Sequence, residues 1–257
     1  MKTSDNLVSI IMPVRNGEHI VEDTLLALLD QTYSEIEIIV VDDNSSDNTF
    51  KALRRVRRKD KRVFISQNVK TYGLSITLNR ALKKAKGQYI AFMNMHDSNS
   101  LERIKRQVLY LKRHPKVVAV GTQAFFLDEA KRRIGKSEFP TEHHQISKNL
   151  LTGTAMQLES VMINRYLLPK DILKFDHQKF PDLYRSLFMK IISFGDFANI
   201  NEHLYYRSPK DNHLEELRLQ VVNHVALWTR AWFTHENRPS FQSLFSPLNS
   251  KVRSSLN

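Results

Sequence analysis

The stretch that decides the fold is Val8–Val14 (VSIIMPV) together with Ile38–Asp47 (IIVVDDNSSD). Each part starts as a run of β-branched and other apolar residues and leads into polar, turn-forming residues. Such runs are typical of buried strands. Between them, Val21, Leu25 and Leu28 recur at the spacing of a helix. The stretch therefore predicts two strands joined by a helix, with polar loops at the strand ends.

The same alternation continues to about residue 125. Strands are predicted over residues 36–41, 63–66, 89–93 and 117–120, and helices over residues 49–59, 75–84 and 101–111. Strands that alternate with helices at this interval predict an α/β fold with a parallel sheet covered on both faces. Ligands bind such sheets at the carboxyl ends of the strands. We therefore expect the chemistry in the loops after Val14, Val41 and Met93, and we expect Asp47 to cap the next helix.

Beyond that point the pattern predicts a smaller and less regular lobe up to residue 210. The sequence Asn212–Glu215 (NHLE) resembles a capping box that would open an amphipathic helix. The apolar stripe of this helix favours packing into the core, with docking to a partner or a membrane as the alternative. The stripe consists of Leu214, Leu217, Val221, Val225, Trp228 and Trp232. The tail after Pro239 is rich in Ser, Asn and Pro, so we expect it to be mobile.

The composition excludes several classes of protein. Of the 257 residues, 41% are hydrophobic and 26% are charged, which is the range of globular domains. The chain has no cysteine, which excludes disulfides, thiolate metal sites and a cysteine nucleophile and suits a reducing compartment. No run of about 18 apolar residues is present, and residues 1–6 do not lead into a signal peptide. We therefore expect a cytoplasmic protein.

The formal net charge of +12 indicates an acidic partner. The densest cluster is residues 51–62, of which eight of twelve are Lys or Arg. A surface that binds single-stranded nucleic acid requires aromatic residues among the basic ones, and this run contains none. Nucleic acid is therefore the disfavoured partner. The remaining interpretations are an ordinary solvated helix face and a patch that faces an anionic membrane.

The loop Asp42–Asp47 (DDNSSD) carries two adjacent carboxylates directly after a buried strand. Such groups are natural acceptors for the N–H groups of a base or for ribose hydroxyls, although a turn that caps the next helix is the alternative. Only seven glycines are present, with no G-x-G-x-x-G after a strand and no G-x-x-x-x-G-K-[ST]. The sequence therefore disfavours a dinucleotide oxidoreductase and a P-loop protein.

Four blocks, in this order, resemble the family 2 glycosyltransferases: Ser9–Asn16 (SIIMPVRN), Glu37–Thr49 (EIIVVDDNSSDNT), Gly73–Asn79 (GLSITLN) and Ala85–Phe92 (AKGQYIAF). The resemblance covers about residues 7–107. It implies a GT-A fold, with a Rossmann-like, mostly parallel sheet flanked by helices and a smaller acceptor-side lobe. The implied domain spans residues 1–210, with the nucleotide half over about 1–125 and the acceptor half over 126–210.

The resemblance also implies an activity. Such an enzyme transfers a sugar from a nucleotide-sugar, here a uridine-linked one, to a surface-glycan or lipid-linked acceptor with inversion at the anomeric carbon. The nucleotide pocket would be lined by Pro13, Val14 and Asn16, with Asp42 or Asp43 on the base and ribose and Asn79 nearby.

One block departs from the family's pattern. Where the family has an acidic D-x-D-D run that binds ribose and a divalent metal, this chain has Asn94-Met95-His96-Asp97. Asn94 would contact the nucleotide, and His96 and Asp97 are the candidate metal ligands. Mg²⁺ prefers oxygen ligands, whereas Mn²⁺ tolerates imidazole, so Mn²⁺ is the expected ion. Two alternatives stay open: basic side chains stabilise the diphosphate without metal, or the chain binds a nucleotide but transfers nothing.

The remaining functional residues lie beyond residue 107, where the resemblance is thinner. Asp182 stands where the family carries the general base that deprotonates the acceptor, although a helix N-cap is an equally good role for it. Arg207 ends a segment that resembles the family's closing strand, where an arginine contacts the diphosphate. The other histidines, apart from His96, show no metal-binding spacing and are expected to be surface or packing residues.

Overall fold

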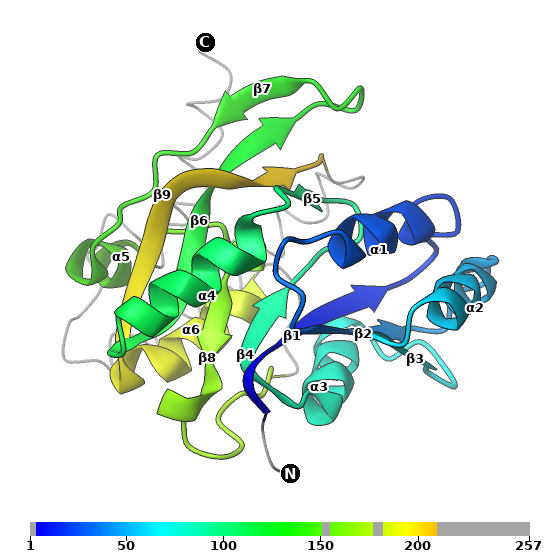
Figure 1. Ribbon diagram of the computed structural model, residues 1–257, viewed down its shortest axis with the longest axis horizontal. Coiled ribbons are helices and arrows are strands. Elements are labelled where there is room, and N and C mark those ends of the chain that lie inside the picture. The colour runs from blue at the N-terminus through cyan, green and yellow to red at the C-terminus, as the bar shows by residue number, and fades with distance from the viewer. Residues whose placement is uncertain (1–3, 151–154, 177–181, 210–257) are drawn as a thin grey trace.

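The computed structural model describes residues 4–150, 155–176 and 182–209 (Figure 1). One sheet runs through them in the order β3-β2-β1-β4-β8-β6-β9-β5, with β7 paired to β6. The strands are β1 Ser4–Val14, β2 Ile36–Asp42, β3 Val63–Gln67, β4 Gly87–Phe92, β5 Ser98–Asn99, β6 Val117–Leu127, β7 Arg133–Lys136, β8 Met162–Asn164 and β9 Asp196–Arg207. The α-helices are α1 Val21–Leu29, α2 Thr49–Lys59, α3 Leu74–Lys84, α4 Arg103–Arg113, α5 His143–Asn149 and α6 Asp182–Ile191. Short 3₁₀ turns are η2 Leu158–Ser160, η3 Arg165–Leu167 and η4 Ile192–Phe194.

The longer strand pairings are parallel, as the alternation of strands and helices predicts. β1 pairs in parallel with β2 and β4, β2 with β3, and β6 with β9. The short strands β5, β7 and β8 supply the antiparallel pairings, and β8 lies between β4 and β6. The expected α/β class is therefore confirmed. β8 joins two parallel blocks into one continuous sheet.

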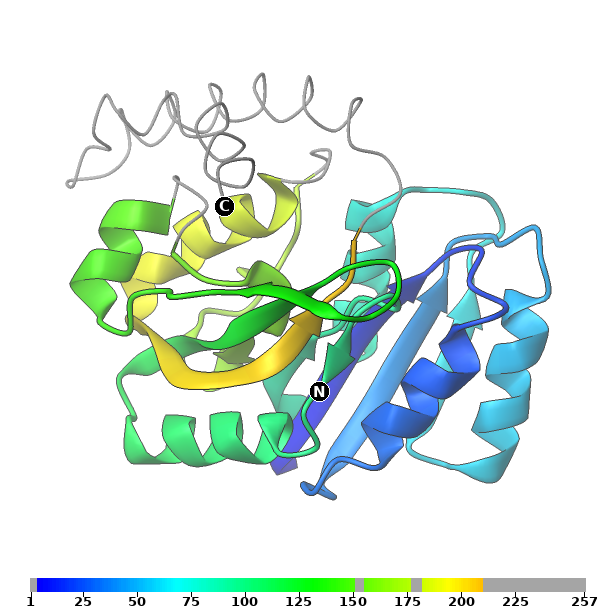
Figure 2. The same cartoon turned by 90° about the horizontal axis from the view of Figure 1, so that it is seen from above.

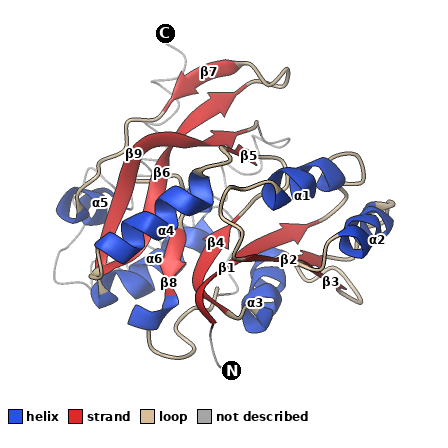
Figure 3. Cartoon of the chain, in the orientation of Figure 1, coloured by secondary structure: helices blue, strands red, loops and turns tan. Residues whose placement is uncertain are grey.

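Helices cover both faces of the sheet (Figures 2 and 3). One core cluster packs α1, α2 and α4 against one face, and a second packs α3, α5 and α6 against the other. All seven residues of β2 are buried, with Ile38 and Val40 in the first cluster and Ile39 and Val41 in the second. A strand buried on both sides reads as a continuous apolar run rather than an alternating one. This explains why residues 36–41 contain four consecutive apolar residues.

Most predicted elements of the first 120 residues lie within two residues of their observed bounds, and α2 matches them fully. The predicted cap is wrong, because Asn48 rather than Asp47 occupies the N-cap position of α2. The Asp47 carboxylate instead accepts the N–H of Thr49 at 3.0 Å and that of Glu18 at 3.1 Å. It therefore links two loops.

The capping box at residues 212–215, its helix and the tail lie outside the described residues. Among the helices that the structure describes, none combines the length and the apolar composition needed to span a bilayer.

Candidate functional site

The loops after β1, β2 and β4 meet at the carboxyl edge of the sheet. β1 lies between β2 and β4, so its end is next to both. The backbone N–H of Asp43 donates to the carbonyl of Val14 at 2.9 Å, and that of Met93 donates to the carbonyl of Ile11 at 3.1 Å. The three loops in which we expect the chemistry therefore lie side by side.

Asn16 holds the loop after β1 against the loop after β2. Its backbone N–H donates to Ser45 Oγ at 2.9 Å, and its Oδ1 accepts the N–H of Ser46 at 3.0 Å. Asn16 and Asn44 both adopt positive φ, at 50° and 57°, a conformation that asparagine tolerates better than most residues. Beside them, Pro13 is half-buried and Val14 is buried. These two loops thus form a fixed frame around the predicted base position.

The two predicted base-binding carboxylates are buried and hydrogen-bonded. Asp42 accepts from Ser45 N at 3.1 Å and from Gln67 Nε2 at 2.9 Å. Asp43 accepts from Asn68 Nδ2 at 2.7 Å, Tyr72 N at 2.9 Å and Gly73 N at 2.8 Å. Burial raises the pKa of Asp43, but the hydrogen bonds to its carboxylate outweigh it, so the pKa lies below its usual value. Asp43 is therefore ionised at neutral pH.

Tyr72 and Arg80 stand beside Asp43. The Arg80 guanidinium lies 4.2 Å from the centroid of the Tyr72 ring and donates to Asn68 Oδ1. Neither residue is among those predicted from the sequence. The signal was available, because residues 68–73 follow β3, whose carboxyl end lies on the same sheet edge as that of β2.

The chain segment Asn94–Asp97 forms a turn, with the N–H of Asp97 donating to the carbonyl of Asn94 at 3.2 Å. Asn94 Oδ1 accepts the N–H of His96 at 3.1 Å, and His96 is exposed. Asp97 is only 4% exposed. Its Oδ2 accepts from the hydroxyl of Tyr205 at 2.6 Å, and its Oδ1 accepts from Ser208 N at 2.8 Å. Asp97 thus anchors the turn to the end of β9.

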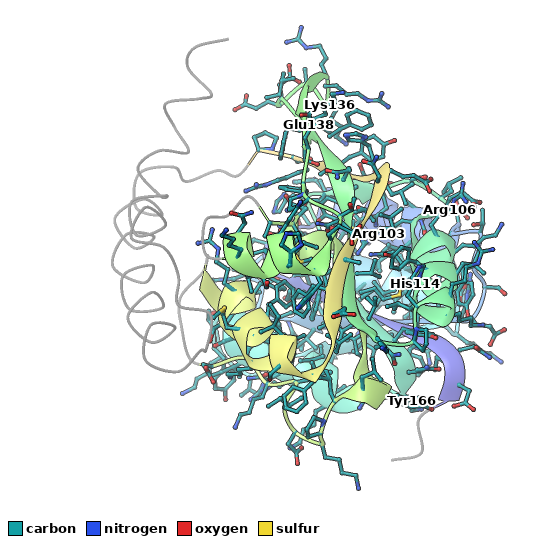
Figure 4. All side chains as sticks on the ribbon, turned by 90° about the vertical axis from the view of Figure 1, so that its left-hand side faces the viewer. Arg103, Arg106, His114, Lys136, Glu138 and Tyr166 are labelled. Carbon is teal, nitrogen blue, oxygen red and sulfur yellow. The ribbon has the colours of Figure 1, made fainter. Side chains whose placement is uncertain are left out.

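Arg103 lies fully buried behind this turn, whereas Arg106 on the same helix lies at the surface (Figure 4). The Arg103 guanidinium lies 5.2 Å from the centroid of the Tyr205 ring. It donates to the carbonyls of Phe92 at 3.1 Å and Ser160 at 2.8 Å. Burial lowers the pKa of Arg103 to about 10, opposed by the nearby Tyr205 and Asp97. Arg103 is therefore charged at neutral pH and joins β4, η2 and β9.

This architecture matches a known family of sugar-transferring enzymes. The model of glycosyl transferase family 2 matches residues 9–170, which is more than half of the chain. The chain belongs to glycosyltransferase family 2. The resemblance seen in the sequence is thereby confirmed, and the chain is a glycosyltransferase.

Two relatives from Escherichia coli have described activities. The glycosyltransferase is 30% identical over 200 residues to WfgD, named UDP-Glc:α-D-GlcNAc-diphosphoundecaprenol β-1,3-glucosyltransferase, and the match covers 77% of this chain and 74% of WfgD. WfaP, of the same described activity, is 37% identical over 106 residues, or 41% of each chain. A third relative, the putative teichuronic acid biosynthesis glycosyltransferase TuaG of Bacillus subtilis, is 32% identical and matched over 42% of its length.

Two solved structures share the fold of the glycosyltransferase. Staphylococcus aureus TarS 1–349 in complex with UDP-GlcNAc superposes with a TM-score of 0.71 at 20% identity, covering 96% of this chain and 73% of TarS. The mannosyltransferase PcManGT from Pyrobaculum calidifontis, in complex with GDP-Man and Mn²⁺, gives a TM-score of 0.66 at 17% identity and covers 97% and 75% of the two chains. These similarities establish the GT-A fold.

The described residues of the glycosyltransferase do not fit a metal site built by the protein alone. No group of three or more His, Cys, Asp or Glu side chains among them is placed to hold one ion. Both carboxylate oxygens of Asp97 accept hydrogen bonds from the end of β9, while His96 lies exposed on the turn. The metal roles of His96 and Asp97 stay predictions.

A second buried carboxylate acts on the same two tyrosines as Asp97. Glu159 in η2 is 6% exposed, and its Oε2 accepts a hydrogen bond from Gln157 Nε2. Burial chiefly raises the pKa of Tyr184 and Tyr205, and the negative charges of Glu159 and Asp97 raise it further. Glu159 is not predicted from the sequence, because a single acidic residue outside any motif gives no signal of burial.

The other predicted site residues of the glycosyltransferase are dispersed. Asn79 on α3 exchanges two hydrogen bonds of 2.8 Å with the backbone of Phe175, so both polar groups of its side chain are in use away from the three loops. Asp182 is the first residue of α6, and because its side chain lies outside the described residues, neither of its predicted roles is tested. Arg207 ends β9, directly before the residue that binds Asp97, and is half-buried.

A cavity of about 420 Å³ opens beside the Asn94–Asp97 turn, on the side of α1. It is lined by Ile20 and α1, by Met93 and residues 95–99, by the tip of the β6–β7 hairpin and by Ser208 and Pro209. Thr24 on α1 donates to the carbonyl of Met95 at 2.9 Å, which holds the turn on this side. The turn is therefore held by α1 on one side and by β9 on the other.

Proposed function

We propose that this glycosyltransferase binds a uridine diphosphate sugar at the loops after β1, β2 and β4. It would transfer the sugar with inversion to a lipid-linked or surface-glycan acceptor. The observation that carries the proposal is the convergence of Asn16, Asp42 and Asp43 with the Asn94–Asp97 turn at one sheet edge. The described activity of WfgD and the UDP-GlcNAc complex of TarS support the choice of donor and acceptor.

The donor pocket is proposed to use Pro13, Val14 and Asn16 as its walls. Asp42 and Asp43 would supply acceptors for the base and ribose. An ionised carboxylate offers about four lone-pair directions, and each of these carboxylates already accepts three hydrogen bonds. Each would therefore accept about one further hydrogen bond from the nucleotide, in a direction fixed by the three that are already made.

The transfer step needs a base and a stabilised leaving group. In the proposed reaction Asp182 takes the proton of the acceptor hydroxyl as its oxygen bonds to the anomeric carbon. The bond from that carbon to the diphosphate breaks on the opposite face, which inverts the centre. Asn94 and Arg207 would contact the departing diphosphate, whose growing charge the arginine stabilises.

The side chains available to bind a metal, His96 and Asp97, determine which ion is proposed. An exposed imidazole at His96 next to an anchored carboxylate at Asp97 favours Mn²⁺ over Mg²⁺. If the leaving diphosphate is neutralised by arginine alone, removal of divalent ions leaves the turnover intact.

Titration calorimetry with UDP, GDP and CDP, with and without Mn²⁺, tests the donor site. The expected result is selective binding of UDP. Absence of binding by all three nucleotides would overturn the proposal. UDP binding without turnover, when UDP-glucose and a GlcNAc-diphospho-lipid are supplied as probes, would instead identify a nucleotide-binding protein that transfers nothing.

A further inference from the structure

The helix α2 carries a concentrated basic surface next to the candidate site. It begins two residues after Asp47, and its exposed side includes Lys51, Arg54 and Arg58 at helical spacing. Nearby acids neutralise only part of the cluster, since Glu22 pairs with Arg55 at 2.8 Å. Asp60 pairs likewise with Arg62 at 2.8 Å. The described residues form no ion pair with Lys51, Arg54, Arg57, Arg58 or Lys61, so this surface keeps a net positive charge.

The basic surface continues around the edge of the sheet. β3 is the edge strand, and α2 and α3 lie on opposite sides of it (Figure 1). Phe64 on β3 is 38% exposed, and two cations approach its ring: Arg57 from α2 at 5.9 Å and Lys86 after α3 at 5.5 Å. The exposed Lys83 and Lys84 in the last turn of α3 extend the surface further. Basic side chains from two helices therefore form one continuous area.

Aromatic rings do belong to this area, contrary to the expectation from the linear sequence. Phe50 lies beneath the guanidinium of Arg54 at 5.0 Å, and Phe64 lies beneath Arg57. Single-stranded nucleic acid needs aromatic faces that are open for stacking with bases. Here one cation lies over the Phe50 ring and two approach the Phe64 ring, so both rings already have cation–π partners. The rings therefore serve to hold the cations in place, which favours a diffuse array of negative charge over stacked bases.

We propose that the surface formed by Lys51, Arg54, Arg57, Arg58, Phe64 and Lys86 docks the enzyme on an anionic lipid bilayer. The choice of lipid over another polyanion rests on the lipid-linked acceptor proposed above. Lysine and arginine side chains can lay their apolar stems along the interface while their charges reach the headgroups. Each basic residue near an anionic membrane adds about 1 kcal/mol of attraction. Docking of α2 would hold the adjacent nucleotide loop close to the plane that contains the acceptor.

Co-sedimentation of the full chain with vesicles tests the proposal, without donor or acceptor present. The vesicles are phosphatidylcholine alone or an equal mixture of phosphatidylcholine and phosphatidylglycerol. Binding is expected only to the anionic mixture and is expected to weaken as salt rises from about 0.1 M to about 0.5 M. The triple variant Lys51→Gln, Arg54→Gln, Arg58→Gln is expected to bind the anionic vesicles on the order of a hundredfold more weakly.

The matched control removes the same charge elsewhere, with Lys112→Gln, Arg113→Gln and Lys116→Gln, which are exposed at the far end of α4. It is expected to retain vesicle binding to within a few fold. An equal loss in both triple variants would overturn the proposal, because net charge alone would then govern binding. Stronger binding to a duplex oligonucleotide than to the anionic vesicles at equal salt would also overturn it. UDP binding measured on the same samples reports separately on the proposed transferase site.

Discussion

The hydroxyl of Tyr205 donates a hydrogen bond of 2.6 Å to Asp97 Oδ2, across 108 positions of sequence. The two residues come from the last strand of the described residues, β9, and from the Asn94–Asp97 turn that follows β4. Because Ser208 N donates to the other carboxylate oxygen, both oxygens of Asp97 link the turn to the end of β9. The position of the Asn94–Asp97 turn therefore depends on the C-terminal strand.

Replacing Tyr205 by Phe removes this hydrogen bond and leaves a buried carboxylate with one donor fewer. The expected cost is about 1.5 to 3 kcal/mol in the free energy of unfolding, because the bond involves a charged group. Urea denaturation measures it. Tyr206→Phe is the control, since the hydroxyl of this half-buried neighbour forms no hydrogen bond to a described residue. Equal losses in the two variants would show that the Asp97 bond contributes nothing specific.

Arg103→Met is expected to destabilise the protein by about 3 to 5 kcal/mol, because it removes a cation near the buried Asp97 carboxylate and a hydrogen-bond donor from several buried carbonyls. Methionine preserves most of the volume, so the loss reports on charge and hydrogen bonding. Arg106→Met removes an exposed arginine from the same helix and is expected to change the free energy by less than about 1 kcal/mol. Calorimetric melting of the two variants decides between these outcomes.

Asp43→Asn is expected to lower stability in a pH-dependent way. The folded protein holds the pKa of Asp43 below its usual value, so the carboxylate stabilises the fold at every pH above the usual value. This contribution disappears as the pH falls through the lowered pKa. The difference in melting temperature between parent and variant should thus be large at pH 7 and shrink as the pH falls through the lowered pKa. Asp60→Asn, at a partly exposed ion pair with Arg62, serves as a control with a small effect at pH 7. A pH-independent difference for Asp43→Asn would contradict the assignment.

Asp182→Asn is expected to lower kcat by a factor of about 10² to 10⁴ with UDP binding unchanged, as loss of a general base does. If Asp182 only caps α6, the variant should instead lose about 1 kcal/mol of stability and keep its kcat. Asp171→Asn removes the same charge at an exposed position and serves as the control. UDP release in the presence of a GlcNAc-diphospho-lipid, combined with thermal melting, separates the two roles.

Chelation with EDTA followed by titration of Mn²⁺ or Mg²⁺ tests the predicted metal ligands. Restoration of turnover by Mn²⁺ at lower concentration than by Mg²⁺ is expected, and His96→Ala should abolish that preference. His114→Ala, an exposed histidine in a different region, should preserve it. Full turnover in EDTA would remove His96 from the mechanism and assign the diphosphate to arginine alone.

The sequence predicts the fold well because its first half is locally consistent. The basic helix Thr49–Lys59 is bounded by polar residues on both sides and carries a clear apolar face, so its observed ends match the prediction. β8 is not predicted from the sequence, because a strand of three residues, Met162–Asn164, is too short to show a hydrophobic period. It forms only because β4 and β6 offer it edges on both sides.

The candidate site is less predictable, because its support comes from residues without a motif. Asp42, Asp43 and Asn16 could be placed from the rule that ligands bind at strand ends. Arg103 lies among Lys105 and Arg106 in sequence, and only its helical phase with Gln107 and Leu111 distinguishes it as buried. Asn79, in contrast, lies within a block that resembles the family, yet its side chain hydrogen-bonds to the backbone of Phe175. Its nucleotide role stays a prediction.

The insertion of β8 between β4 and β6 has a consequence for synthesis on the ribosome. The block β3-β2-β1-β4 is complete once Phe92 has emerged, and its strands are parallel neighbours with helices between them. Its β4 edge, however, acquires a partner only when Met162–Asn164 arrives. Until then the nascent chain exposes an unpaired strand edge of the kind that recruits other chains. Chaperone dependence and truncation-induced aggregation should therefore concentrate in products that end between β4 and β8.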